Sequence, residues 1–341
     1  NGNDIAVAWN AFELHPPANL AGQDQNYFDE LRVGRTWAEV AGELAVSEPF
    51  NYAVGGNLIG QTNTDTFTVW TEVGSGTAHS TVYTNSLNYA PLRSSGNRVQ
   101  LASFSGNTKD ASLTFAGAGT ALYYSFLVRF DNVSGMGGAW QALTRVSTSG
   151  ANGPAVFVRT NSSGSGFDLG IHKRANSGAV QTDASIQAVG TGNPHFIVVK
   201  YQVDTNDNDP MLIWLDPPKA SLGGVEPAAV FTSTNGADTT VSWSAFDLLP
   251  PNQVSGFFDE ARVGLTWAGV TPVSTTTAVA SSANPSTEGS PVTFTATVTS
   301  SGSNAPTGAV LFKANGYALA SPVGDRKSTR LHSSHSSISY A

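Results

Sequence analysis

A long internal repeat is the feature that most constrains this chain. Residues 1–17 (NGNDIAVAWNAFELHPP) and 235–251 (NGADTTVSWSAFDLLPP) are identical at ten of 17 positions. A second block follows each copy: residues 28–40 (FDELRVGRTWAEV) and 258–270 (FDEARVGLTWAGV) are identical at ten of 13 positions. A repeat of this length marks two copies of one structural unit. We therefore expect residues 1–42 to be the C-terminal remnant of one domain and residues 43–272 to be a complete second copy.

The complete copy is predicted to be all-β. Short apolar or alternating runs are separated by polar turns such as Asn235-Gly236, and no stretch keeps an apolar helical period for three turns. Many short strands with polar turns indicate a two-sheet antiparallel jelly-roll sandwich. The predicted strands are 65–70, 80–84, 98–102, 112–116, 122–130, 140–146, 155–160, 167–172, 196–203, 211–215, 241–248 and 257–263.

The run 111–128 contains no charged residue over 18 positions, which is the length of a membrane span. Gly117 and Gly119 interrupt it, however, and residues 112–115 alternate with period two, so it is predicted to be a hairpin. We expect no membrane span in this chain. Alternation along 122–130 predicts one face with Leu122, Tyr124, Phe126, Val128 and Phe130, and a solvent-facing side with Tyr123, Ser125, Leu127 and Arg129.

The C-terminal third differs in character. Residues 291–300 (PVTFTATVTS) alternate cleanly, and Asn315-Gly316 is a strong hairpin turn. Residues 273–324 therefore predict three or four strands, about half of the seven that an Ig-type sandwich needs. The last residues, 325–341 (DRKSTRLHSSHSSISYA), end that pattern and are rich in Ser, His and basic residues.

Three motifs carry a resemblance to known families. The motif FDE-x-RVG-x-TWA at 258–268, with EPFNY at 48–52 and ALYYSFLVRF at 121–130, resembles bacterial LamG-like, concanavalin A-type jelly rolls, whose members include lectins and glucanases. Residues 273–324 resemble the N-terminal half of a bacterial Ig-like repeat, and 325–341 resemble a translated sequencing adapter, a non-native tail. The resemblance implies the fold, but one fold carries many functions.

Composition excludes several function classes. The chain has 17 Lys and Arg against 25 Asp and Glu, a formal charge of −8, and only 12% of its residues are charged. Phosphate neutralisation needs clustered Lys and Arg, so we expect no nucleic-acid partner. There is no cysteine, which removes disulfides and thiolate nucleophiles from consideration.

The carboxylates of the repeat are the first candidates for catalysis. Asp29/Glu30 and Asp259/Glu260 are adjacent in sequence, and adjacent strand residues point to opposite faces, so neither pair is expected to line one cleft. We expect Asp259 or Glu260 to tie the last strand to its sheet through Arg262. The E-x-D-x-x-E strand of laminarinase-type glucanases is absent, as are H-E-x-x-H and G-x-S-x-G. These observations predict a chain that is not an enzyme.

The acidic loop 204–209 is the best candidate for a metal site. Asp and Asn oxygens at alternate positions suit Ca²⁺, although the spacing is not that of an EF-hand. The alternative is an ordinary hairpin loop, in which Asp and Asn are common. LamG-like relatives often bind Ca²⁺, so the resemblance implies calcium as the one possible cofactor. The predicted ligands are Asp204, Asn206, Asp207, Asn208 and Asp209.

Aromatic and polar side chains on solvent-facing strand positions are candidates for ligand binding, because a sugar ring stacks on an aromatic face. Trp243 and Trp267 recur as Trp9 and Trp37, which favours a packing role for them in each copy. Sequence alone leaves open whether the remaining candidates converge on one sheet. They are Tyr123, Arg129, Asp168, His172 and Lys200.

Together these patterns predict a fragment of a large, secreted, bacterial surface protein. Its function is predicted to be non-catalytic recognition or adhesion, with an extracellular glycan or matrix as partner. Two alternatives remain at this point: an accessory region of a polysaccharide-degrading enzyme, or a structural spacer without a ligand.

Overall fold

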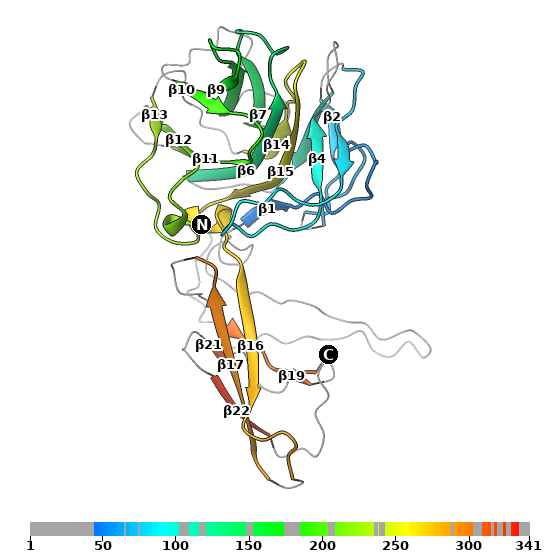
Figure 1. The fold of residues 1–341 in the computed structure, drawn as a ribbon, viewed down its shortest axis with the longest axis vertical. Coiled ribbons are helices and arrows are strands. Elements are labelled where there is room, and N and C mark those ends of the chain that lie inside the picture. The colour runs from blue at the N-terminus through cyan, green and yellow to red at the C-terminus, as the bar shows by residue number, and fades with distance from the viewer. Residues whose placement is uncertain are drawn as a thin grey trace, which may run out of the picture. The chain divides into compact units, whose positions relative to one another are not determined.

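The computed structural model describes residues 44–333, except for 65, 74–75, 102–108, 116–120, 148–152, 174–184, 204–208, 235–237, 239–242, 288–289, 303–308, 315–316, 319–322 and 325–328. Residues 1–43 and 334–341, and with them the first copy of the repeat, lie outside the described residues. The described part is all-β, as the sequence predicts: two large antiparallel sheets form a sandwich, and a smaller third sheet follows (Figure 1).

The first large sheet has eight strands. Its order is β13-β12-β11-β6-β15-β4-β3, and β1 also pairs with β15. Strand β6 is the longest, and β15 lies beside it in antiparallel pairing. The strands are β1 (Leu44–Glu48), β3 (Thr81–Tyr83), β4 (Arg98–Leu101), β6 (Ala121–Asn132), β11 (His195–Gln202), β12 (Met211–Leu215), β13 (Phe231–Ser233) and β15 (Ser255–Gly264).

The second large sheet has seven strands in the order β10-β9-β8-β7-β14-β5-β2. Strand β14, which belongs to the second copy of the repeat, pairs with both β7 and β5 in the middle of this sheet. The strands are β2 (Thr71–Val73), β5 (Asp110–Thr114), β7 (Gln141–Ser147), β8 (Ala155–Thr160), β9 (Gly166–His172), β10 (Ser185–Gly190) and β14 (Ala245–Leu248).

The core lies between the two sheets. The predicted alternation of β6 is confirmed, because its even-numbered side chains from Leu122 to Phe130 all belong to this core. Phe126 stacks on Phe258 with ring centroids 5.0 Å apart. Trp243 is buried in the same core, as its recurrence in the repeat predicts. Burial of apolar surface on this scale is the main driving force for the fold.

The other face of the eight-stranded sheet is also buried. A second apolar cluster, here called the outer apolar layer, lies on this face. It joins the apolar side chains on the outer side of the sheet to the segments that cover them: the loop 86–95, the region of the 3₁₀ helix η1 (Lys219–Ser221) and the helix α2 (Trp267–Val270). Trp214 of β12 packs edge-on against Trp267, 5.0 Å between centroids. The odd-numbered face of β6 was expected to meet solvent, and that expectation is wrong for Tyr123, Ser125 and Leu127, which are at most 6% exposed.

Two local predictions are corrected by the structure. Residues 65–70 are not a strand: Phe67 donates its N–H to Asn63, forming a turn, and β2 begins only at Thr71. The run 111–128 is not a hairpin either, because β5 and β6 belong to different sheets. Strands β1, β10 and β13 were not predicted.

The C-terminal region forms small sheets. Strand β17 (Val292–Ser300) pairs with β16 (Thr275–Ser281) and β22 (Thr329–Ser333). Two further pairs are β18 (Ala309–Val310) with β21 (Val323–Gly324), and β19 (Lys313–Ala314) with β20 (Tyr317–Ala318). Strand β22 lies within the adapter-like segment, whose origin stays a prediction, as does the Ig-like assignment of this region. Among the described residues, no helix has the length and apolar character needed to cross a membrane.

Candidate functional site

The carboxylates of the FDE motif share one partner, against the expectation that they point to opposite faces. The register of β15 shifts between Asp259 and Arg262, and Glu260 adopts φ 51°, so a bulge replaces strict alternation there. Ser86 donates its hydroxyl to both acids, at 2.6 Å to Asp259 Oδ2 and 3.3 Å to Glu260 Oε1. Glu260 also forms a buried ion pair with Arg262, the predicted partner.

Both acids hold the loop 86–95 in place. Asp259 Oδ2 accepts the backbone N–H of Leu87 at 2.6 Å, and Glu260 Oε1 accepts that of Ser95. Burial raises the pKa of Asp259 well above its usual value, and the charge of Glu260 adds to the rise. Because these oxygens are committed to the loop that covers the outer apolar layer, we assign the pair a structural role.

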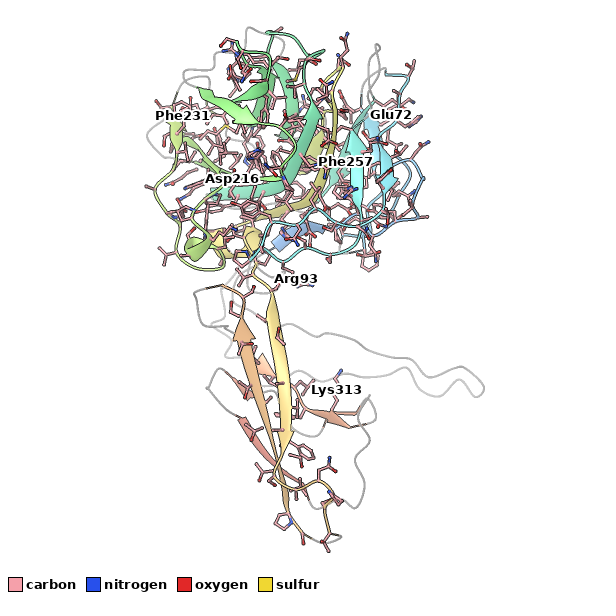
Figure 2. All side chains as sticks on the ribbon, viewed as in Figure 1. Glu72, Arg93, Asp216, Phe231, Phe257 and Lys313 are labelled. Carbon is pink, nitrogen blue, oxygen red and sulfur yellow. The ribbon has the colours of Figure 1, made fainter. Side chains whose placement is uncertain are left out.

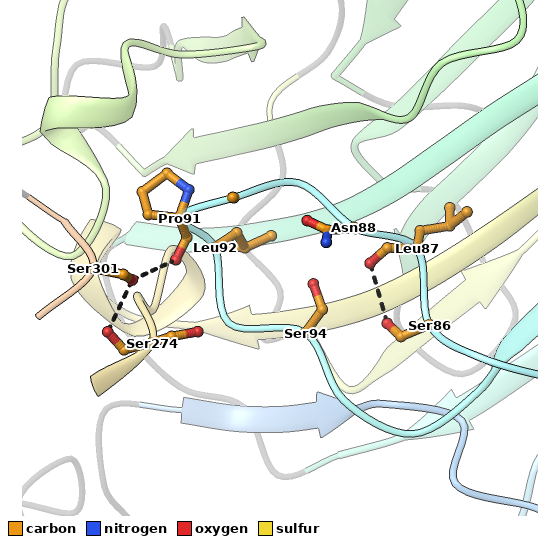
Figure 3. Close-up of a pocket in the computed structure, with 9 residues that line it drawn as sticks. Ser86, Leu87, Asn88, Pro91, Leu92, Ser94, Ser274 and Ser301 are labelled. Carbon is orange, nitrogen blue, oxygen red and sulfur yellow. Dashed lines mark hydrogen bonds between the residues drawn. The ribbon is translucent and has the colours of Figure 1, made fainter. Parts of the chain in front are cut away.

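A pocket of about 380 Å³ lies along the same loop (Figure 3). It is lined by residues of 86–94 together with Ser274 and Ser301. Ser301 donates its hydroxyl to the carbonyl of Pro91 at 3.3 Å and to that of Ser274 at 2.9 Å. Its lining contains no titratable side chain, so we place no acid–base chemistry there.

The five predicted ligand-binding residues do not converge. Tyr123, Arg129 and Lys200 lie on the outer side of the eight-stranded sheet, in β6 and β11. Asp168 and His172 lie in β9 of the other sheet, where Phe167, Leu169 and Ile171 point into the core and leave the alternate positions on the outside. The set is therefore divided between opposite outer faces of the sandwich.

Tyr123 and Lys200 form a closed cluster with Glu226. The Tyr123 hydroxyl donates to Glu226 Oε2 at 2.5 Å, and Lys200 Nζ lies 3.1 Å from the same oxygen. Lys200 Nζ also stands 5.1 Å from the centre of the Tyr123 ring. Burial lowers the pKa of Lys200, but hydrogen bonds to Tyr123 and Glu226 and the charge of Glu226 outweigh it, so the pKa is raised overall. The three side chains therefore satisfy one another's charges and hydrogen bonds.

The outer face of the seven-stranded sheet carries a row of polar side chains in direct register. Arg145 of β7 stands opposite Asp247 of β14, and its Nε donates to Asp247 Oδ2 at 2.8 Å. The same row continues through Ser112 on one side and through Ala155 to His172 on the other. Asp247 is 0% exposed, and its Oδ1 has no hydrogen-bond partner among the described residues.

A second row crosses the same face four residues further along β8. Arg159 of β8 donates its Nε to Asp168 Oδ2 of β9 at 3.0 Å, and its guanidinium carbon lies 4.4 Å from the centre of the Trp140 ring. Asp168 is 4% exposed, whereas the Arg159 side chain remains 33% exposed. A buried acid thus fixes a partly exposed arginine, and the arginine lies over a half-buried tryptophan.

Asp110 of β5 completes the polar face. Burial, together with the negative charge of Asp247, raises its pKa to about 6 against the lowering effect of Arg145. These mutual influences mean that Asp110, Arg145 and Asp247 are electrostatic neighbours. Sequence analysis missed Arg145, Arg159, Trp140 and Asp110. Only Trp140 carried a signal, because an aromatic ring is a usual stacking surface for a sugar.

The calcium prediction falls largely outside the described residues. Asp204, Asn206, Asp207 and Asn208 are in the stretch 204–208, and only Asp209 is described. Asp209 is 2% exposed and its Oδ2 accepts the Tyr201 hydroxyl at 2.6 Å. This carboxylate therefore has an internal structural partner. Within the described residues, no group of three or more His, Asp or Glu side chains is arranged to hold a metal ion.

Comparisons with known proteins find likeness in structure alone. No family model and no curated protein matches the sequence. The carbohydrate recognition domain of Emp47p aligns over 63% of this chain and 96% of its own length, with 12% identity and a TM-score of 0.37. The endo-β-1,4-glucuronan lyase of the fungus Trichoderma reesei aligns over 64% and 97%, with 16% identity and a TM-score of 0.37.

A structure of botulinum neurotoxin type C, whose cell entry is described as dependent on two ganglioside molecules, aligns over 64% of this chain and 49% of its own. Its identity is 10% and its TM-score 0.37. At these values the likeness carries no argument about function. The fold assignment rests on the strand order above, and the LamG-like resemblance stays a prediction.

Proposed function

We propose that the sandwich is a non-catalytic recognition module that binds an extracellular glycan through the outer face of its seven-stranded sheet. The observation that carries the proposal is the Trp140–Arg159–Asp168 row. A half-buried indole ring is held by a guanidinium that is itself fixed by a buried carboxylate. A sugar ring needs such a combination of a flat apolar surface and oriented hydrogen-bond donors.

Rigidity makes this row suitable for recognition. An arginine that is already fixed loses little conformational freedom on binding, so more of the contact energy becomes affinity. Arg159 keeps a third of its side chain exposed while its Nε is bonded to Asp168. Its remaining N–H groups can donate to hydroxyl groups of a ligand.

The buried ion pairs argue against a spacer without a ligand. Asp247 and Asp168 are almost fully buried on an outer face, where an apolar pair of similar size would stabilise the sheet at least as well. A sheet that served only as a spacer has no need of two desolvated carboxylates. The same surface would also serve an accessory module of a polysaccharide-degrading enzyme in a secreted bacterial protein.

One observation favours a second candidate function, glycoside hydrolysis. Asp110 has its pKa raised to about 6 and lies near the carboxylate of Asp247, the kind of pairing that general acid catalysis uses. Asp247, however, is 0% exposed and is engaged by Arg145, so a substrate has no access to it. We therefore favour binding over hydrolysis.

A glycan array probed with the full chain tests the recognition proposal. We expect binding to at least one polysaccharide, and an empty array would support the spacer instead. Each bound polysaccharide is then incubated with the chain and assayed for reducing ends. We expect none; release that disappears in Asp110→Asn would establish the hydrolytic function.

Calcium binding by the loop 204–209 remains a proposal with its own test. A ligand that binds only the folded state raises stability, so millimolar CaCl₂ should raise the melting temperature. The double variant Asp204→Ala/Asp207→Ala should lose that rise. An unchanged melt, or an equal rise in the double variant, would show that the loop is a plain hairpin.

A further inference from the structure

A cluster of two arginines and two aromatic rings lies on the opposite face of the sandwich from the glycan surface proposed above. Tyr83 and Arg98 face each other across β3 and β4, and Phe257 and Arg129 face each other across β15 and β6. The guanidinium carbons of Arg98 and Arg129 lie 4.2 and 4.8 Å from the centre of the Phe257 ring. Figure 2 labels Phe257 on its strand.

The cluster is accessible where the outer apolar layer ends. Phe257 belongs to the edge of that layer and is 8% exposed, because the arginines cover its ring. Tyr83 packs against it with centroids 5.3 Å apart and is itself 43% exposed. Arg98 also lies over Tyr83, 5.4 Å from the ring centre.

The two cations differ in how they are neutralised. Arg129 pairs with Asp131, Nε to Oδ1 at 2.9 Å. Arg98 makes no ion pair among the described residues, and there the Nε of neither arginine has a partner in hydrogen-bonding geometry. Burial lowers the pKa of Arg98, and the charge of Arg129 lowers it further. The charges of Asp259 and Asp131 also act on Arg98, but Asp259 is hydrogen-bonded to the loop 86–95 and Asp131 is paired with Arg129.

The aliphatic part of an arginine side chain often covers apolar surface. Arg129, which is paired with Asp131, would be enough to cover Phe257 in this way. A second guanidinium without an acid adds repulsion to the site, which an incoming anion would relieve. The planar fork of arginine suits carboxylate and sulfate oxygens, which it can bind with two parallel hydrogen bonds. Tyr83, exposed beside it, offers a ring face to the sugar that carries the anion.

We propose that Tyr83, Arg98, Arg129 and Phe257 form a binding site for the acidic groups, carboxylate or sulfate, of an anionic polysaccharide. The site lies on the other sheet from the Trp140 row, so it goes beyond the proposed function and does not depend on it. Arg98 contacts the anion, Arg129 and Phe257 hold Arg98 in place, and Tyr83 stacks on the sugar ring.

The test measures affinity of the full chain for three polymers: polygalacturonate, which carries carboxylates, dextran sulfate, and neutral dextran. We expect the first or the second to bind more tightly than dextran. Arg98→Gln should weaken that binding roughly tenfold or more, the usual worth of a charge-assisted hydrogen bond. Arg98→Lys keeps the positive charge but not the planar guanidinium, so it should retain only part of the affinity.

Lys109→Gln is the matched control, because it removes one positive charge from the other sheet, where Lys109 pairs with Glu72. If Lys109→Gln and Arg98→Gln lose the same affinity, the attraction is unspecific and the proposed site is wrong. Unchanged affinity in Arg98→Gln would contradict the site as well. Sodium acetate and sodium sulfate are tested last, as small anions. If the chain binds these salts but neither charged polymer, the site binds small anions only, and the proposal of a polysaccharide ligand is wrong. Melting curves confirm that each variant folds.

Discussion

The two outer faces of this sandwich are covered in different ways. The eight-stranded sheet is covered by the loop 86–95, η1 and α2, which bury Trp214 and Trp267 in a second apolar layer. The seven-stranded sheet carries ion pairs instead, Arg145 with Asp247 and Arg159 with Asp168. Both sheets share one core, so the difference lies in what each outer face is for: one completes the fold, and the other presents fixed polar groups.

The difference also separates two kinds of energy. Apolar burial stabilises the fold in proportion to area and needs no particular geometry. A buried ion pair contributes little net stability, yet breaking it is costly because it leaves one uncompensated charge. Substitutions on the two faces should therefore differ in size and in their response to pH.

The largest effect should come from the outer apolar layer. Trp267 is 4% exposed and packs on Trp214, so Trp267→Ala should lower the free energy of unfolding by about 3–5 kcal/mol. Urea unfolding followed by circular dichroism measures this. Trp140→Ala, at a half-buried position outside that layer, should cost less, about 1 kcal/mol. Equal costs at the two positions would remove the distinction between the faces.

The next effect should come from the Arg145–Asp247 pair. Arg145→Met leaves the fully buried Asp247 without its partner, and we expect a loss of about 3 kcal/mol. The double variant Arg145→Met/Asp247→Leu should recover most of that stability, because no charge remains buried. Urea unfolding of both variants decides the point: a double variant as unstable as the single one would mean that the pair itself stabilises the sheet.

A smaller, pH-dependent effect should come from Asp110. Its pKa is raised from 3.8 to about 6 by burial, so the folded state binds more protons than the unfolded state across that range. Stability from this group is present below about pH 4 and is lost as pH rises through about 6.

Asp110→Asn removes that loss, so the variant should melt roughly 2–4 °C above the wild type at pH 8, the shift that about 1 kcal/mol gives in a domain of this size. At pH 4 the two should melt alike. Thermal melts between pH 4 and pH 8 measure the difference, and an advantage for Asn that is independent of pH would contradict the assigned cause.

Much of the fold follows from local sequence patterns. The period of two along β6 predicts correctly which side chains enter the core, and β8 and β12 were predicted with their observed bounds. The repeat likewise predicts the packing role of Trp267. These features depend on a few consecutive residues, which is why one sequence is enough to predict them.

Other features depend on residues far apart in the chain. Arg145 and Asp247 meet only because β7 and β14 are neighbours in one sheet, and nothing local to either strand indicates the pairing. The bulge at Glu260 interrupts the alternation of side chains along β15, so the two carboxylates do not point to opposite faces as expected. Sequence likewise did not indicate that the loop 86–95, η1 and α2 cover the outer face of the eight-stranded sheet, so Tyr123 was expected to meet solvent.

The central claim is that a glycan is recognised on the outer face of the seven-stranded sheet, and one comparison of variants tests it most directly. Neutral glycans bound on an array are measured again by titration with Trp140→Ala and with Tyr83→Ala, which lies on the opposite face. The account predicts a roughly tenfold loss for Trp140→Ala, as expected when an aromatic stacking contact is removed, and unchanged affinity for Tyr83→Ala. A loss confined to Tyr83→Ala, or equal affinity in both variants and the wild type, would contradict it.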